Sequence, residues 1–190
     1  MEAPAIISRH RRPFLLPVWL TFGAVFGLFV AAVVAFLIYR SATTTTVVVL
    51  ARHAEKESSA IQDPPLSAEG EQRAERLGQM FGRGKGVGRI DAIYVSDARR
   101  TQQTAAPLAE RLGKQAEIVP AADTKGLVSR IMREHQGGTV LIIGHSNTVP
   151  ELIHDLGDID VPPIGDDEYD TLYVLSIPSF GHASVLRMAY

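Results

Sequence analysis

The sequence of 190 residues contains no cysteine. Disulfide bonds, thiol nucleophiles and thiolate metal ligands are therefore all excluded. The absence does not assign a redox compartment, because a protein without cysteine can work in any of them. Excess charge is also lacking: the formal net charge is -2 at pH 7. The composition therefore gives no reason to expect a nucleic-acid partner.

Charge is absent altogether between Pro13 and Tyr39, where most residues are Leu, Val, Phe, Ala or Gly. A membrane-spanning helix needs about 20 apolar residues, and this run is longer. Three arginines precede the run and one follows it, namely Arg9, Arg11, Arg12 and Arg40. The basic excess before the run predicts a cytoplasmic tail over 1–12 and a transmembrane signal-anchor helix over 13–40. The rest of the chain is then expected outside the cytoplasm.

A cleaved signal peptide is the alternative interpretation of this run. Its apolar core would span about 7–15 residues before an A-x-A-like cleavage site, and no such site follows Tyr39. We therefore expect a single-pass membrane protein whose partner is the lipid bilayer through 13–40. Gly23 and Gly27 form a G-x-x-x-G pair, which can bring two helices close together. A homodimer through this helix is a further hypothesis.

Strand and helix patterns alternate through the rest of the chain, after a linker over 41–46. β-branched and apolar runs predict strands over 47–51, 91–96, 117–119, 139–143, 171–177 and 184–188. Apolar stripes and capping residues predict helices over 67–81, 100–112, 124–135 and 149–156. The alternation predicts one α/β domain over 47–190, a three-layer α/β/α sandwich with a mainly parallel sheet and an antiparallel edge.

Polar side chains follow three of these strands at the point where each strand ends. They are Arg52 and His53; Ser96, Arg99 and Arg100; and His145, Ser146 and Asn147. Ligands bind outside the carboxyl ends of the strands in such sheets. Guanidinium groups bind phosphate oxygens through paired hydrogen bonds. The sequence therefore predicts an anion site at this edge of the sheet.

Three sequence blocks carry a family resemblance. "RHAEK" over 52–56, "SDARRTQQTAAPLA" over 96–109 and "VLIIGHSNT" over 140–148 resemble, in this order, the signature blocks of the histidine phosphatase (phosphoglycerate mutase-like) superfamily. In the second block, Arg100 falls in register with the arginine of that family, and Gln103, Thr104 and Ala105 follow it. The resemblance extends over the domain from Val47 onward.

The resemblance implies a phosphoric monoester hydrolase that acts on phosphoester or phosphohistidine substrates. His53 would attack phosphorus and become a phosphohistidine, while Arg52, Arg100 and His145 would hold the phosphoryl oxygens. Further substrate contacts would come from Ser146, Asn147 and Glu55. A neutral His53 is needed for attack, whereas His145 is more useful when protonated. No metal or cofactor is expected, and the partner is a phosphorylated substrate.

The acid that protonates the leaving group stays open at this stage. Asp123 opens the helix after the third strand and is the preferred candidate. Glu55 lies closer to His53 in sequence, and some small family members have no carboxylate in this role. The short separation between the second and third blocks is similar to that of small phosphatases, including those that act on phosphohistidine in proteins. The predicted topology favours a substrate outside the cytoplasm.

Other functions fit the residues less well. A membrane-anchored, non-catalytic phosphate- or protein-binding module on the same fold is the alternative, but such a module would be expected to lose the nucleophile or an anchoring arginine. His53 and Glu55 fit the first part of a zinc deaminase motif, which requires a later cysteine pair. Gly144–Thr148 differs from a G-x-S-x-G elbow at its last position. The glycine-rich segment over 82–88 lacks the Ser or Thr and the preceding strand of a P-loop, and is expected to be a turn.

Overall fold

The computed structural model describes residues 18–42, 44–82 and 89–190. The chain divides into two compact units, Met1–Ser41 and Ala42–Tyr190. The expected cytoplasmic tail, residues 13–17 of the expected signal anchor and residues 83–88 of the glycine-rich segment lie outside the described residues.

The described part of the first unit is helix α1 (Val18–Ala42), whose last residue already belongs to the second unit. Its stretch Trp19–Tyr39 is long and apolar enough to cross a membrane, a property that signal sequences share. A helix of 25 residues is about 37 Å long at about 1.5 Å per residue. The hydrocarbon core of a bilayer is about 30 Å thick. Large apolar side chains such as Phe22, Leu28 and Phe36 are exposed.

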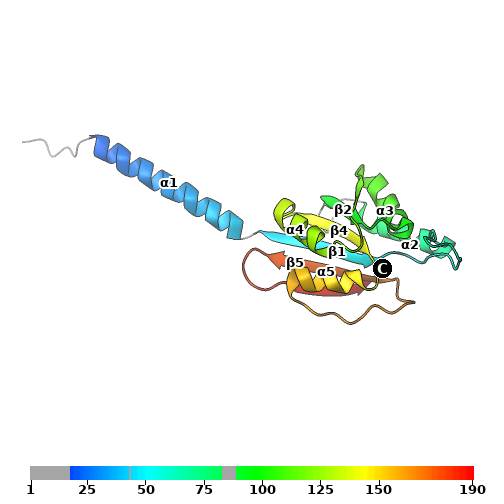
Figure 1. Cartoon of the computed structure of the whole chain (residues 1–190). Coiled ribbons are helices and arrows are strands. Elements are labelled where there is room, and N and C mark those ends of the chain that lie inside the picture. Colours follow the sequence, from blue (N-terminus) through cyan, green and yellow to red (C-terminus); the bar gives the residue numbers. More distant parts are fainter. Residues whose placement is uncertain (1–17, 43, 83–88) are drawn as a thin grey trace, which may run out of the picture. The chain divides into compact units, whose positions relative to one another are not determined.

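The second unit is built on a six-stranded sheet with the order β3-β2-β4-β1-β5-β6 (Figure 1). Its strands are β1 (Thr45–Arg52), β2 (Ala92–Val95), β3 (Ala116–Ile118), β4 (Thr139–Gly144), β5 (Thr171–Pro178) and β6 (Ser184–Ala189). The first four strands in this order are parallel to their neighbours. β5 runs antiparallel to β1, and β6 antiparallel to β5. The mainly parallel sheet with an antiparallel edge is therefore confirmed.

Helices cover both faces of this sheet. They are α2 (Ala68–Phe81), α3 (Arg99–Leu112), α4 (Thr124–Glu134) and α5 (Thr148–Gly157). Successive side chains of a strand point to opposite faces. Val48 and Leu50 of β1 accordingly join the core formed with α4 and α5. Val49 and Ala51 join the core formed with α2 and α3. This arrangement confirms the expected three-layer sandwich.

Local signals fix most helix ends where the sequence predicts them. Ser67 caps α2 by accepting a hydrogen bond from the backbone of Gly70, and Gly113 ends α3 with a positive φ of 62°. Gly70 is also needed for packing, because a Cβ there would lie 2.1 Å from the carbonyl oxygen of Glu55. β1 begins at Thr45, two residues before its expected start, and α1 continues to Ala42, so the connection between them is shorter than 41–46.

Candidate active site

The carboxyl ends of β1, β4 and β2 meet because these strands are parallel neighbours. Arg52 of β1 pairs with Gly144 of β4. The next residue, His53, donates its backbone N–H to the carbonyl of Gly144 at 2.9 Å. The rings of His53 and His145 come to a centroid distance of 5.4 Å in an edge-on arrangement. The sheet therefore brings the predicted strand-end residues together.

His53 has one ring nitrogen committed to the backbone. Its Nδ1 lies 2.8 Å from the carbonyl oxygen of Ala54. A carbonyl oxygen only accepts, so Nδ1 carries the proton and Nε2 keeps its lone pair. Burial lowers the pKa of His53 to about 4, and the positive charge of Arg100 acts in the same direction. The imidazole is thus neutral near pH 7, which is the form that a nucleophile requires.

The Gln-Thr-Ala segment of α3 supports the backbone beyond His53. The Thr104 hydroxyl donates to the carbonyl of Arg100 at 2.7 Å and accepts from the N–H of Ala54 at 3.0 Å. The side-chain oxygen of Gln103 accepts from the N–H of Leu66 at 2.9 Å. Thr104 is fully buried. These two side chains therefore fix the backbone on both sides of the loop between β1 and α2.

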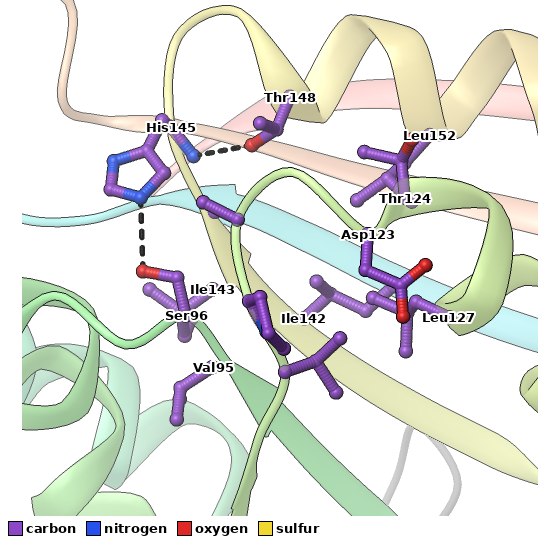
Figure 2. Close-up of a pocket in the computed structure, with 14 residues that line it drawn as sticks. Val95, Ser96, Asp123, Thr124, Leu127, Ile142, Ile143, His145, Thr148 and Leu152 are labelled. Carbon is purple, nitrogen blue, oxygen red and sulfur yellow. Dashed lines mark hydrogen bonds between the residues drawn. The ribbon is translucent and has the colours of Figure 1, made fainter.

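His145 follows β4 and is held at both ring nitrogens. Nε2 lies 2.9 Å from the hydroxyl of Ser96 (Figure 2). Nδ1 lies 3.3 Å from Nη2 of Arg100. A guanidinium only donates, so Nδ1 accepts from Arg100 and the ring proton is on Nε2, donated to Ser96. The Ser96 hydroxyl in turn lies 2.9 Å from that of Thr101.

His145 is therefore neutral in this arrangement. Burial lowers its pKa, the charge of Arg100 lowers it further, and Asp97 opposes them. The expected preference for protonated His145 needs a ligand that supplies negative charge beside the ring, because an anion favours the charged form.

Arg100 is positioned by a carboxylate that the sequence did not reveal. Asp63 accepts from the backbone N–H of Arg99 at 3.1 Å and 3.2 Å, at the N-terminus of α3. One Asp63 oxygen also lies 3.4 Å from Nη1 of Arg100. The residue before the helix, Ala98, has no side chain with which to cap it. Asp63 thus replaces the missing cap and at the same time orients Arg100.

Arg52 is held by the loop that precedes β5. Its Nη1 donates to the carbonyls of Gly165 at 2.7 Å, Asp166 at 2.8 Å and Glu168 at 3.2 Å. The guanidinium lies over the ring of Tyr169, 4.1 Å from its centroid. This loop was not predicted as part of the site, because nothing local in "IGDDEY" indicates contact with Arg52, more than 100 positions earlier in the sequence.

Both arginines keep an unused donor inside the site. Nε of Arg52 and Nε of Arg100 are buried and have no hydrogen-bond partner. A buried donor without a partner costs about 1–3 kcal/mol. Two such donors beside His53 and His145 are suited to the oxygens of a bound anion.

Glu55 has a partner that sequence reasoning did not assign. Nε and Nη2 of Arg73 contact its carboxylate at 2.9 Å and 2.6 Å, with both side chains largely buried. Burial alone would raise the pKa of Glu55, but the hydrogen bonds from Arg73 outweigh it and the pKa is lowered. Both carboxylate oxygens accept from Arg73, so Glu55 ties the β1 end to α2.

Asp123 lines the same pocket as Ser96 and His145 (Figure 2). Its Oδ1 accepts from the N–H of Gly126 at 3.0 Å and so caps α4. In Figure 2 the carboxylate points toward the first turn of α4 rather than toward His145. Asp123 therefore has a structural role, and one of its oxygens is not used by the cap.

The remaining predicted substrate contacts, Ser146 and Asn147, are more exposed than Arg52 and His53. Ser146 is half-buried and Asn147 is exposed, and Asn147 makes no side-chain cap to α5. Arg99 is exposed. His135 is half-buried, and its Nε2 lies 2.9 Å from the hydroxyl of Tyr94. Across 18–42, 44–82 and 89–190, no group of three or more His, Cys, Asp or Glu residues could hold a metal ion.

Known proteins share the fold of this domain and part of its sequence pattern. The profile of the histidine phosphatase superfamily (branch 1) matches residues 48–123, less than half of the chain. The protein histidine phosphatase SixA complexed with tungstate superposes with a TM-score of 0.62 and 21% sequence identity, over 75% of this chain and 96% of SixA. The domain therefore shares its fold with SixA, and its residues 48–123 match the family model.

Other solved structures share this histidine phosphatase fold. Mycobacterial glucosyl-3-phosphoglycerate phosphatase with inorganic phosphate gives a TM-score of 0.59 at 18% identity, over 76% of this chain and 96% of that one. A protein named mycobacterial hydrolase 1 gives 0.58 at 18% identity, over 77% and 98%. Among curated proteins, no sequence matches the chain. These comparisons show a shared fold, together with a family match over residues 48–123.

Proposed function

We propose that this chain is a phosphatase that transfers the phosphoryl group of a phosphoester or phosphohistidine to His53 and then to water. The observation that carries the proposal is the hydrogen bond from Nδ1 of His53 to the carbonyl of Ala54. This bond leaves the lone pair of a neutral, buried imidazole on Nε2. The charges of Arg100 and Arg52 act on this ring, and the ring of His145 lies beside it.

In the first step, Nε2 of His53 attacks phosphorus. The Nε2–P bond forms as the bond between phosphorus and the leaving oxygen breaks. The unpartnered Nε groups of Arg52 and Arg100 donate to the phosphoryl oxygens, where negative charge increases in the transition state. When the anion binds, Nδ1 of His145 takes up a proton from water, gives up the hydrogen bond that it accepted from Nη2 of Arg100, and donates to a phosphoryl oxygen.

We assign protonation of the leaving oxygen to Asp123. Both oxygens of Glu55 are occupied by Arg73, whereas Asp123 uses Oδ1 for the cap of α4. Oδ2 then carries the proton to the leaving group, and this requires the Asp123 side chain to turn from the first turn of α4 toward the site. In the second step Asp123 takes a proton from water. The O–P bond forms, the N–P bond breaks, inorganic phosphate leaves and His53 regains its lone pair.

The membrane anchor and the substrate class belong to the same proposal. We propose that α1 spans the bilayer with the N-terminus in the cytoplasm, because three arginines precede the apolar run. The phosphatase domain is then outside the cytoplasm, and its substrate is a phosphorylated compound or protein of that compartment. Gly23 and Gly27 provide a helix-pairing surface for a homodimer.

Substitution of His53 tests the chemistry. His53→Ala is expected to abolish turnover of phosphoesters, because no other described side chain in the site has a neutral nucleophilic nitrogen at this position. The variant is expected to keep orthovanadate binding through Arg52, Arg100 and His145. Arg52→Ala is expected to lose binding and turnover together, because a charge-assisted hydrogen bond contributes about 1.5–3 kcal/mol.

The intermediate is trapped by an alkaline quench, because phosphohistidine is labile in acid. Mass spectrometry should then find phosphate on the peptide that contains Arg52–Lys56. Phosphate on Ser146, or full activity of His53→Ala, would refute the assignment. A panel of phosphoesters and a phosphohistidine protein, assayed beside His53→Ala, identifies the substrate class.

A further inference from the structure

The guanidinium of Arg52 is only partly available to a ligand. Nη1 points into three backbone carbonyls of the loop before β5. Nε is buried and has no partner. The Nε–Nη2 edge is therefore the edge left for an anion, and it presents two parallel N–H groups that match two oxygens of a phosphoryl group.

The loop itself is fixed at both ends. Ile164 is buried in the core beneath α4 and α5, and the N–H of Glu168 donates to the carbonyl of Gly165 at 3.1 Å. The Glu168 carboxylate accepts from the hydroxyl of Thr171, the first residue of β5, and from Arg187 of β6. An ion pair between the loop and the edge strand thus holds the turn whose carbonyls face Arg52.

Tyr169 covers the face of the same guanidinium. The distance of 4.1 Å from the guanidinium carbon to the ring centroid is in the range of a cation–π contact. The ring also lies 6.1 Å from that of His53. A planar ring on one face and carbonyls at one end leave the guanidinium little freedom to rotate.

We propose that residues 165–169, secured by the Glu168–Arg187 ion pair, are a positioning cradle that directs the Nε–Nη2 edge of Arg52 toward the phosphoryl group. This inference rests on the proposed function and deepens it, since it states how the substrate arginine is oriented. Tyr169, Glu168 and Arg187 act through Arg52. Rigid orientation saves the ordering cost that a free guanidinium would incur on binding.

Orthovanadate binding to the full chain in nonionic detergent tests the cradle by calorimetry. Tyr169→Leu is expected to weaken binding about tenfold, and Tyr169→Phe to retain most of the affinity because the ring remains. Arg187→Gln is expected to weaken binding about threefold. Arg130→Gln is the matched control, since Arg130 forms a similarly exposed ion pair with Glu117 on other elements, and it should not change the affinity.

A double-substitution cycle separates positioning from direct contact. In an Arg52→Lys background, where the planar group is gone, Tyr169→Leu should change vanadate affinity less than about twofold. The proposal would be overturned if Tyr169→Leu lowered vanadate affinity as much in the Arg52→Lys background as in the wild type. It would also be overturned if Tyr169→Phe bound vanadate as weakly as Tyr169→Leu. Vanadate binding without turnover in the wild-type chain would refute the phosphatase while leaving the cycle measurable. Absence of vanadate binding would refute both the proposed phosphatase function and the positioning role of residues 165–169.

Discussion

The buried, neutral imidazole of His53 suits its proposed role as a nucleophile but lowers stability in acid. Burial keeps the imidazole neutral, with its pKa lowered to about 4, and the hydrogen bond to Ala54 decides which nitrogen keeps the lone pair. His145 has a lowered pKa for the same main reason, burial, and the nearby Arg100 adds to it. His53 and His145 are therefore both hard to protonate in the folded state. This difference from the unfolded state should make stability, as well as catalysis, depend on pH.

The stability of the domain is expected to fall as the pH falls from 6.5 toward 4. The unfolded chain takes up a proton on His53 near pH 6.5, whereas the folded chain does so only near pH 4. The unfolded state binds more protons than the folded state in this pH range. The free energy of unfolding therefore decreases as the pH is lowered. His53 alone should account for about 2 kcal/mol between pH 7.5 and pH 5.

Urea unfolding of the full chain in detergent, followed by circular dichroism at pH 7.5 and pH 5, measures this difference. His53→Gln has no group that titrates in this range, so its midpoint should change less between the two pH values. An equal change in the wild type and in His53→Gln would contradict the assigned pKa.

The strands and their polar ends could be predicted because the signals are local. An apolar run followed at once by charged residues identifies each strand end, and parallel pairing then brings Arg52, His53 and His145 together. The cap at Ser67 and the glycine at Gly113 fix helix ends in the same local way.

Loop residues of the site could not be predicted from such signals. Asp63 reaches the N-terminus of α3 from a loop more than 30 positions earlier, and Tyr169 meets Arg52 only after the chain has completed α5. Their roles depend on tertiary packing, which leaves no periodicity in the sequence. Glu55 was a candidate acid because it is close to His53 in sequence. In the structure, however, Arg73 of α2 hydrogen-bonds both oxygens of its carboxylate.

Asp123 joins the start of α4 to the proposed proton transfer, and two substitutions separate these roles. Asp123→Asn keeps a side-chain oxygen that can cap the helix, so the free energy of unfolding should change by less than about 0.5 kcal/mol. Its turnover of an alkyl phosphate should fall by about 10²- to 10⁴-fold. An aryl phosphate with a good leaving group needs no acid and should be affected little.

Asp123→Ala removes the cap as well and should cost about 1 kcal/mol of stability. Comparison of the two variants by urea unfolding and by turnover of both phosphates completes the test. Equal turnover of the alkyl phosphate by Asp123→Asn and the wild type would leave Asp123 with its capping role alone.

The two units of the chain bury apolar surface in different ways. The domain Ala42–Tyr190 encloses its large side chains on both faces of the sheet. Helix α1 instead exposes residues such as Phe22 and Leu37. Exposed apolar surface of this extent is stable in lipid but not in water. The proposed membrane anchor accounts for this surface, because it places α1 in a bilayer.

The full chain is accordingly expected to remain in the membrane fraction after washing with high salt and with alkaline carbonate. Burial of about 20 apolar residues is sufficient to hold a helix across the bilayer, and neither treatment removes such a segment. A variant with Phe22, Phe26 and Phe29 replaced by aspartate should lose this retention, because a charged side chain costs about 2.5–3.5 kcal/mol at the centre of a spanning helix.

Protease added to intact cells should reach the domain if three arginines hold the N-terminus inside. Recovery of a soluble wild-type form that begins near Ser41 would show instead that the apolar segment is a cleaved signal, and protection of the domain from the protease would reverse the proposed topology.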